Sequence, residues 1–448
     1  MQPVCRAGVA QPGERDPRRA HPIGQGLDLR AGADKFGRRI EPDEAKRVPD
    51  GRRAAVPSPG VPAPPAVERA DALYAWVQDR IPSWDYDGLA GFLDGLLAAA
   101  RDDAARLRTL EALSLLLDRR YPTGALKRSA VLAQIDAAVS RLAEGLRTAG
   151  SGRLPWIGAE TKIPAAAGAE SVAVVDARGF PAEGEGSLSR AIVDLHRAGF
   201  RRAVVANARG HRFLGCGLGV GSAGLRIDVF GSSGDYLGSG LDGAWISVHG
   251  SAQDQLGQIL KEGTIAVAGD VGQTFLYGAK GGRAFVLGNA AGRPLINAVG
   301  RPRVVINGTC LDYLAESFMA GDPLDGGGFV ILNGVAYDES GRLLDLETPY
   351  PGGNLFSLAS GGAIYVRDPE RKVTEDQLNG GEFAPVEPAD WNVIRPMLLE
   401  NERLLGVPLA ALLTVDGATL APSSVYRKIW PSGHKALLPE EAWVRREA

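Results

Sequence analysis

Short apolar strands that end in glycine recur in this chain every 19 or 20 residues, and no other feature constrains its fold so strongly. "LRIDVFG" ends at Gly231, and the next strands end, after steps of 19, 19, 19 and 20 residues, at Gly250, Gly269, Gly288 and Gly308. A longer coil brings "FVILNG" to Gly334, and "AIYVRD" places Asp368 in the equivalent position. Self-similarity at a fixed period is typical of a solenoid in which each repeat forms one coil.

Two apolar columns run through these strands. Two positions before the terminator stand Val229, Val248, Val267, Val286, Ile306, Leu332 and Val366, and four positions before it stand Ile227, Ile246, Ile265, Ala284, Val304, Val330 and Ile364. Because a strand alternates with a period of two, both columns face one way, and the mixed positions between them face the other. Stacked parallel coils would place valine on valine and isoleucine on isoleucine. The pattern predicts a right-handed parallel β-helix over residues 210–370, and the absence of six-residue steps argues against the left-handed acyltransferase type.

Glycine and polar residues have expected roles at the bends of such a coil. We expect the terminator glycines to supply positive φ and to remove side chains where neighbouring coils crowd. The turns also carry the polar set Asp235, Tyr236, Asp270, Gln273 and Tyr277. We interpret this set as turn chemistry, since Asp and Gln satisfy backbone groups at bends. Contact with a partner or the lining of a channel is the alternative.

Four further segments flank the predicted coils. Residues 1–66 are rich in Arg, Pro, Gly and Asp, which predicts a disordered lead or a wrongly assigned start. Residues 68–149 show apolar spacing of i, i+3, i+4 and i+7, which predicts an α-helical domain of four helices. A strand, a helix and a strand follow as a βαβ-like lead-in over residues 171–208. Residues 374–448 form a tail in which we expect a helix.

Caps and core positions follow from the same pattern. We expect Ser83 and Asp102 or Asp103 to begin helices and Gly150 to end one. Trp84 and Tyr86 are expected to pack in a core rather than to bind a ligand. Because solenoids need their apolar ends covered, the helical domain and the tail are expected to cap them.

The composition limits the possible partners and the compartment. The formal net charge of −3 and pI of about 6.1 give no case for nucleic acid or a membrane surface. The sequence contains no run of about 18 apolar residues, so we expect no membrane span. The N-terminus shows no apolar signal region either. Cys5, Cys216 and Cys310 are scattered and odd in number, which favours a reducing cytoplasm and excludes an iron–sulfur ligand set from this chain.

Several patterns suggest chemistry but lack its context. "GLGVGSAG" contains G-x-G-x-x-G, yet a strand is expected next, where a dinucleotide site needs a helix. No G-x-S-x-G occurs, and neither His211 nor His249 has an evident nucleophile partner. His196 is expected to be a surface or packing residue. The acidic residues of the tail are interpreted as a solvated helix face, and they are Glu387, Asp390, Glu400 and Glu402.

Four stretches resemble successive coils of the GXGXG domain. They read "GSSGDYLGSGLDGA", "GDVGQTFLYGAKGG", "AAGRPLINAVG" and "VINGTCLDYLAESFMAGDPLDGGG", and the resemblance covers about residues 171–370. This domain closes the large subunit of glutamate synthase, forms a separate subunit in split, archaeal-type glutamate synthases, and recurs in one of the subunits of formylmethanofuran dehydrogenase.

The resemblance implies a structural role rather than a catalytic one. In glutamate synthases the domain packs between the glutamine-hydrolysing and flavin-bearing domains and braces the path of ammonia. It implies no catalytic, cofactor or metal residue in this chain, with FMN and an iron–sulfur cluster on partner subunits of the amidotransferase and FMN synthase types. We therefore expect a non-catalytic subunit of a glutamate-synthase-like oxidoreductase complex.

Two other functions stand beside it. The first is a subunit of a formylmethanofuran dehydrogenase or formyltransferase-type one-carbon complex, although the helical domain and tail do not resemble that subunit. The second is a carbohydrate-cleaving β-helix, which needs carboxylates and a base gathered on one outer face. The outward positions Asp228, Ser247, His249 and Asn307 are not expected to form such a cluster.

Overall fold

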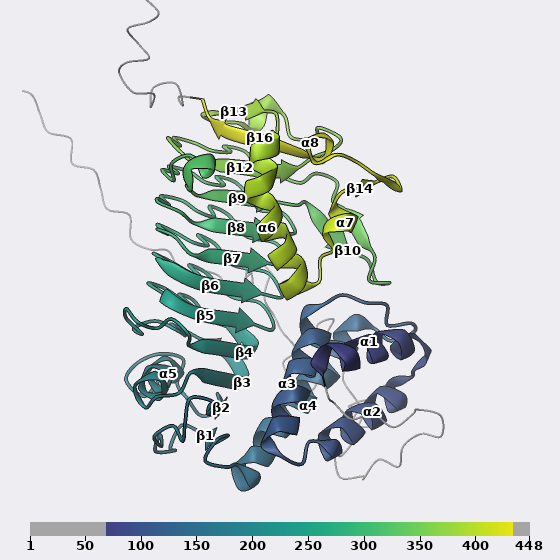
Figure 1. Cartoon of the computed structure of the whole chain (residues 1–448), viewed down its shortest axis with the longest axis vertical. Helices are drawn as coiled ribbons and strands as arrows, with labels where there is room; N and C mark the ends of the chain where they lie inside the picture. Colours follow the sequence, from purple (N-terminus) through teal and green to yellow (C-terminus); the bar gives the residue numbers. More distant parts are fainter. Residues whose placement is uncertain (1–68, 433–448) are drawn as a thin grey trace, which may run out of the picture. The chain divides into compact units, whose positions relative to one another are not determined.

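The computed structural model describes residues 69–432 of the chain (Figure 1). The predicted lead over residues 1–66 lies outside the described residues, as does the end of the predicted tail, residues 433–448. One sheet of 12 strands dominates the described part, and Figure 1 shows its strands stacked in nearly continuous chain order. The predicted mainly β solenoid, with helices before it and in the tail, is confirmed.

The strands of the main sheet follow one another as rungs. In spatial order they are β1 (Trp156–Ile157), β2 (Val172–Asp176), β3 (Arg202–His211), β4 (Arg226–Ser233), β5 (Asp242–Val248), β6 (Glu262–Val267), β7 (Arg283–Val286), β8 (Arg303–Ile306), β9 (Phe329–Leu332), β12 (Ala363–Arg367), β16 (Tyr426–Pro431) and β13 (Gly381–Ala384). Neighbours from β1 to β12 pair in parallel, whereas β16 pairs antiparallel with both β12 and β13. Two small antiparallel pairs join β10 (Val335–Tyr337) to β11 (Leu343–Asp345) and β14 (Thr414–Val415) to β15 (Ala418–Thr419).

The helices lie mainly before and after the coils. They are α1 (Ala70–Arg80), α2 (Tyr86–Ala99), α3 (Asp103–Asp118), α4 (Arg128–Ala149), α5 (Leu188–Arg197), α6 (Pro388–Leu405), α7 (Leu409–Leu412) and α8 (Pro422–Val425). Short 3-10 helices are η1 (Ile81–Ser83), η2 (Pro323–Asp325) and η3 (Glu375–Gln377). Helix α5 connects the parallel strands β2 and β3, so the βαβ-like lead-in supplies rungs of the same sheet.

Both apolar columns predicted from the sequence lie in register. Ile227 pairs with Ile246, which pairs with Ile265, and Val229, Val248 and Val267 pair in the same order. The columns continue without a shift to Ile364 and Val366, and every member is at most 1% exposed. Each fully buried side chain of this kind contributes about 1.5–3 kcal/mol to folding. The core inside the coils is therefore built from stacked copies of the same strand positions.

Each coil turns a corner through three alternate residues with positive φ. In one coil these are Tyr236, Gly238 and Gly240, with φ of 61°, 65° and 69°. The pattern recurs at Gln255, Gly257 and Ile259, at Thr274, Leu276 and Gly278, at Arg293, Leu295 and Asn297, at Tyr313, Ala315 and Ser317, and at Asn354, Phe356 and Leu358. Left-handed backbone costs roughly 1–2 kcal/mol for a residue with a Cβ.

Hydrogen bonds between coils offset this cost. The N–H of Tyr236 donates to Asp254 O of the next coil, that of Gly238 to Leu214 O of the previous coil, and that of Gly240 to Gln258 O of the next. The N–H groups of the three positive-φ residues thus point in turn to the next, the previous and the next coil, which bonds the corner to the coils on both sides of it.

Most terminator glycines lie where the adjacent coil leaves no room for a Cβ atom. Positive φ occurs at Gly231 (105°) and Gly334 (62°), whereas Gly250, Gly269, Gly288 and Gly308 lack it. A Cβ at Gly250 would collide with the carbonyl oxygen of Gly231, and one at Gly308 with the side-chain oxygen of Asn289. The expectation of positive φ therefore holds at the two outer positions only. Close approach of adjacent coils explains the other four.

The outer face of the sheet is buried by two separate layers. Helices α1 to α4 cover its first rungs, where Val172, Val204 and Phe230 join their core. Helix α6 and the segments after it cover the later rungs, where Phe285 and Ile331 are fully buried. Figure 1 shows α6 lying across the strands. The sheet therefore has an apolar core on each face.

This arrangement corrects the expectation about capping. The helical domain packs on the flank of the rungs through the outward side chains of β2 to β4 rather than on the end of the rod. In the tail, the amphipathic "VYRKIWP" does cover an end, because β16 adds to β12 in antiparallel pairing and Ile429 enters the coil core. The outward columns are apolar enough to need cover, which periodicity alone did not reveal.

The local start and stop signals are partly those expected. The side chain of Asp102 accepts a hydrogen bond from Ala105 N at the start of α3, and α4 ends at Gly150. Ser83 does not begin α2, since Asp85 accepts from Gly88 N in that role. Trp84 is buried and packs against other aromatic rings, as expected, but Tyr86 is 41% exposed. The cap of α2 is thus Asp85, two residues after Ser83.

The acidic face predicted for the tail is not wholly solvated. Asp390 is 1% exposed and accepts hydrogen bonds from Lys428 Nζ at 2.8 Å and Tyr365 Oη at 2.6 Å. It also closes a capping box with the backbone N–H of Glu387 at the start of α6. The solvated-face interpretation is therefore wrong for Asp390, because α6 lies with this residue against β12 and β16.

A buried amide pair fixes the C-terminal part of α6 to the rod. Asn307 and Asn401 each donate to the other at 2.9 Å, and Asn333 donates to the same oxygen of Asn307. Tyr426 Oη donates to Asn333 Oδ1, which brings β16 into the network. All four side chains are buried. If one of them is removed, water cannot replace the hydrogen bonds that its partners lose.

We predict that Gly250→Ala destabilises the fold and that Gly292→Ala does not. A methyl group at residue 250 meets backbone of the neighbouring coil, whereas nothing lies within 4 Å of the corresponding position at Gly292. We expect the free energy of unfolding in urea to fall by about 1–3 kcal/mol for the first variant. It should change by less than about 1 kcal/mol for the second. Equal effects would contradict the close-approach explanation.

A second prediction concerns the amide pair. Asn401→Ala leaves the buried amide of Asn307 without its reciprocal partner, so we expect a loss of about 1–3 kcal/mol in thermal or urea unfolding. Arg395→Ala, on an exposed position of the same helix, is the matched control and should stay within about 0.5 kcal/mol of the wild type. The idea fails if the two variants unfold alike.

Candidate functional site

The polar turn residues predicted from the sequence form ladders between coils. Asp235 accepts a hydrogen bond from Asp254 N, and Asp254 in turn accepts from Gln273 N. A second ladder runs from Ser251 through Asp270 and Asn289 to Thr309, each side chain accepting from the backbone N–H one coil later. These contacts are the turn chemistry expected for Asp235 and Asp270. Gln273 takes part in the ladder through its backbone N–H and not through its side chain.

The two tyrosines of the predicted set lie outside these ladders. Tyr236 occupies a corner position with positive φ, and its ring stacks on Phe213 at 5.1 Å with the Arg212 guanidinium over both. The Tyr277 hydroxyl accepts from Asn297 Nδ2 at 3.3 Å. The five residues are therefore spread over several turns, and their role toward a partner or channel stays a prediction.

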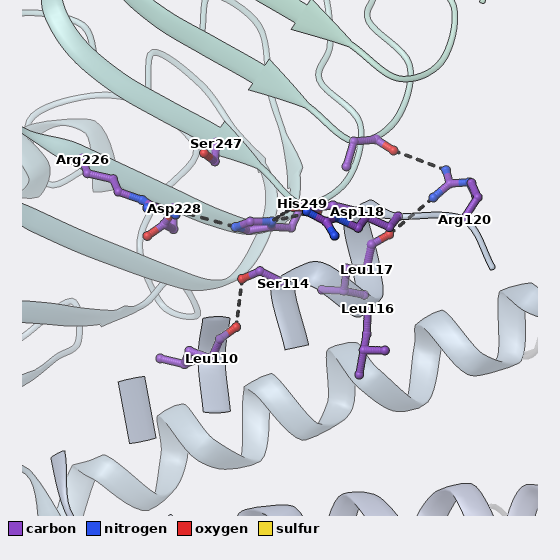
Figure 2. Close-up of polar contacts among 12 residues, drawn as sticks. Leu110, Ser114, Leu116, Leu117, Asp118, Arg120, Arg226, Asp228, Ser247 and His249 are labelled. Carbon is purple, nitrogen blue, oxygen red and sulfur yellow. Dashed lines mark hydrogen bonds and ion pairs between the residues drawn. The ribbon is translucent and has the colours of Figure 1, made fainter. Parts of the chain in front are cut away.

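A buried histidine joins the helical domain to the coils. His249 lies at the end of β5, with its ring stacked on Phe230 of the neighbouring rung at 4.3 Å. Its Nδ1 is 2.8 Å from Asp118 Oδ1, at the end of α3, and its Nε2 is 3.9 Å from Asp228 Oδ1. Figure 2 shows His249 between these two carboxylates. Asp228 also contacts the guanidinium groups of Arg202 and Arg226 at 2.9 and 2.8 Å.

The charges set the protonation of this cluster. Burial by itself lowers the pKa of His249, but Asp118 and Asp228 outweigh it and raise the pKa to about 9. Burial likewise acts to raise the pKa of Asp228, yet the imidazolium and the two arginines hold that pKa well below its usual range. At neutral pH the cluster therefore contains a cationic imidazole between two carboxylates.

This geometry does not assemble a hydrolytic site. A cationic imidazole cannot act as a general base, and the nearby Ser247 hydroxyl accepts a hydrogen bond from Trp245 Nε1 at 2.9 Å. Asp228 and His249 lie together, but Asp118 of α3 and two arginines complete their surroundings as an ion-pair cluster. The cluster's evident action is to hold α3 on the sheet.

A groove of about 1220 Å³ lies on the outer face of the sheet beside this cluster. Strands β4 to β8 line it together with α1, α3 and the C-terminal end of α6. Eight arginines and four carboxylates are among its lining residues. Three of the carboxylates already have cationic partners, namely Asp71 with Arg69, Glu111 with Arg202, and Asp118 with His249. The groove is therefore strongly positive.

Part of that charge comes from one outward column of the sheet. Arg226, Trp245, Thr264, Arg283 and Arg303 are paired in register on successive rungs. Each of them stands five residues before its terminator, so the 19- and 20-residue spacing contained this signal. The contact between Asp118 and His249 left no such signal, since 131 residues separate them.

The described residues offer little to a metal or a cluster. Among residues 69–432, no group of three or more His, Cys, Asp or Glu side chains is placed to hold a metal ion. Cys216 and Cys310 are free, and the sheet places them in different coils. Burial raises the pKa of Cys216 to about 11 and that of Cys310 beyond the physiological range. These thiols do not fit the ligand set of an iron–sulfur cluster.

The coils match a known protein family. The family described as "GXGXG motif" matches residues 185–396, from just before α5 into α6. This part of the chain carries the GXGXG motif. Within the matched range, the segment "YLGSG" holds the corner residues Tyr236, Gly238 and Gly240, whose left-handed backbone forms the bend that is hydrogen-bonded to both neighbouring coils.

Three further observations concern relatives, membrane spans and the glycine-rich segment before β4. No curated protein matches the chain. None of the helices within residues 69–432 is long and apolar enough to cross a membrane. "GLGVGSAG" forms turns followed by β4, so the expectation that a strand and not a helix follows it is confirmed.

We predict that the His249 cluster makes stability depend on pH. The folded pKa of about 9 exceeds the unfolded value of about 6.5, so the stabilisation is complete below pH 6.5 and is lost as pH rises through 9. The wild type should lose about 3 kcal/mol of unfolding free energy across this window. His249→Gln should lose this dependence, as urea unfolding at several pH values would measure.

His196→Gln is the control for this experiment. His196 lies on α5 away from any carboxylate pair, and burial followed by Arg201 lowers its pKa. The variant should keep the decline of the wild type above pH 6.5. An unchanged pH profile in His249→Gln would show that the imidazole carries no stabilising charge.

Proposed function

We propose that this chain is a non-catalytic structural subunit of a glutamate-synthase-like complex. Its GXGXG domain would brace the contact between an amidotransferase-type subunit and an FMN synthase-type subunit, and with it the passage of ammonia. The FMN and the iron–sulfur cluster would belong to those partners. The single observation that carries the proposal is the match of residues 185–396 to the GXGXG family.

The architecture supports a bracing role. The rungs from β1 to β12 form one continuous parallel stack whose corners are bonded to the coils on both sides. Such a stack resists bending, because displacing one coil breaks backbone hydrogen bonds to two others. The outer face is held further by the Asn307–Asn401 pair and by the His249 cluster. A rigid body of this kind suits the spacing of two enzymes at a fixed distance.

The site chemistry is consistent with activity residing elsewhere. The buried polar groups hold helices on the sheet, since His249 contacts Asp118 of α3 and Asp390 of α6 contacts Lys428 of β16. We propose accordingly that the chain contributes geometry, and that glutamine hydrolysis and the redox step occur on partner subunits.

Affinity purification of the tagged chain from its native cells tests this proposal. We expect it to bring down a glutaminase-type subunit and a flavin-bearing subunit, with flavin absorbance in the purified complex. In the reconstituted complex, removing the chain should reduce glutamine-dependent glutamate formation far more than formation from added ammonia.

Two results would overturn the proposal. Copurification with a molybdenum or tungsten enzyme and a formyltransferase would replace it by the one-carbon complex of the formylmethanofuran type. Glutamine- and ammonia-dependent activities that fall equally, or not at all, when the chain is omitted would remove its role in ammonia passage.

A further inference from the structure

Two arginines stand in register on adjacent rungs, and neither has a carboxylate partner in the described part of the chain. Arg283 of β7 pairs with Arg303 of β8, and both line the groove. Within residues 69–432 neither forms an ion pair, although Arg283 and Glu400 influence one another electrostatically. Arg303 has the ring of Phe329 beneath it at 5.8 Å. Adjacent strands lie about 4.8 Å apart, and like charges directly opposite one another destabilise a sheet.

The surroundings increase this unbalanced charge. Arg301 also lines the groove and forms no ion pair with any residue of the 69–432 range. Arg226 and Arg403 line it too, the first paired with Asp228 and the second with Glu400. Glu262 is the one lining carboxylate not already accounted for by a cationic partner. An anion supplied from outside would relieve the repulsion between Arg283 and Arg303.

We propose that the groove is a binding site for an organic phosphate, with Arg283 and Arg303 holding the phosphate group and Arg301 beside them. A carboxylate satisfies the planar fork of one arginine, whereas a phosphate has more acceptor oxygens and up to two charges, so it engages two guanidinium groups at once. This inference rests on the groove alone and goes beyond the proposed bracing role.

The size of the groove favours an organic phosphate over the free ion. Its volume of about 1220 Å³ exceeds the range of about 300–1,000 Å³ usual for small-molecule sites, so it has room for much more than a free phosphate ion. Trp245 lies in the same outward column and presents a half-buried ring, with the Arg403 guanidinium 5.8 Å from its centroid. Trp245 stands two rungs from Arg283, and its flat ring suits the remainder of a ligand such as a nucleotide that reaches along the column from its phosphate.

Isothermal titration calorimetry of the full-length chain with AMP at low salt tests the site. We expect one AMP per chain, and we expect Arg283→Gln/Arg303→Gln to weaken binding at least tenfold. The matched control is Arg190→Gln/Arg197→Gln, which removes the same charge from exposed positions of α5 and should leave the affinity within twofold. Circular dichroism melting checks the folds, and the groove variant should melt no lower than the wild type because a repulsive pair is removed.

Each other outcome overturns the proposal. Absence of AMP binding, or equal weakening by the two double variants, would show that the groove is not the site. Inorganic phosphate that binds as tightly as AMP would restrict recognition to the free ion. A hexaglutamate peptide that displaces AMP and binds more tightly would identify the groove as a surface for acidic protein segments.

Discussion

The stacking of identical strand positions from coil to coil is the constraint on which this structure depends. Because each repeat returns the chain after 19 or 20 residues, Ile227, Ile246 and Ile265 meet in one column, as do the valines beside them. A shift of one residue would turn every inward side chain to the outer face. The register is therefore enforced by burial on every rung, and the corners add hydrogen bonds to the coils on both sides.

The outer face of the same sheet explains the rest of the architecture. Its first rungs are covered by α1 to α4 and its later rungs by α6 and the segments that follow. Between the two layers the outward column of Arg226, Arg283 and Arg303 remains beside a groove. The positive charge of that groove is thus a consequence of where the two covering layers stop.

Buried polar contacts fix the covering layers in place. The His249 cluster holds α3, and the Asn307–Asn401 pair holds α6. A buried polar group without a partner costs free energy of folding. Each of these contacts therefore stabilises one position of its helix on the sheet, and a shifted helix would lose the contact. This specificity matters for a body whose proposed role is to hold other subunits at a defined distance.

The sequence by itself determined the period, the inward columns and the hydrogen-bonding role of Asp235 and Asp270, because these depend only on residues one coil apart. It also contained the outward column five residues before each terminator, in which Arg226, Arg283 and Arg303 stand. The tertiary structure alone decided that Asp390 is buried, that Asp118 meets His249, and that the helical domain covers a flank rather than an end. Those contacts join segments with no shared period, and the packing of one amphipathic layer on another leaves no trace in the spacing of either.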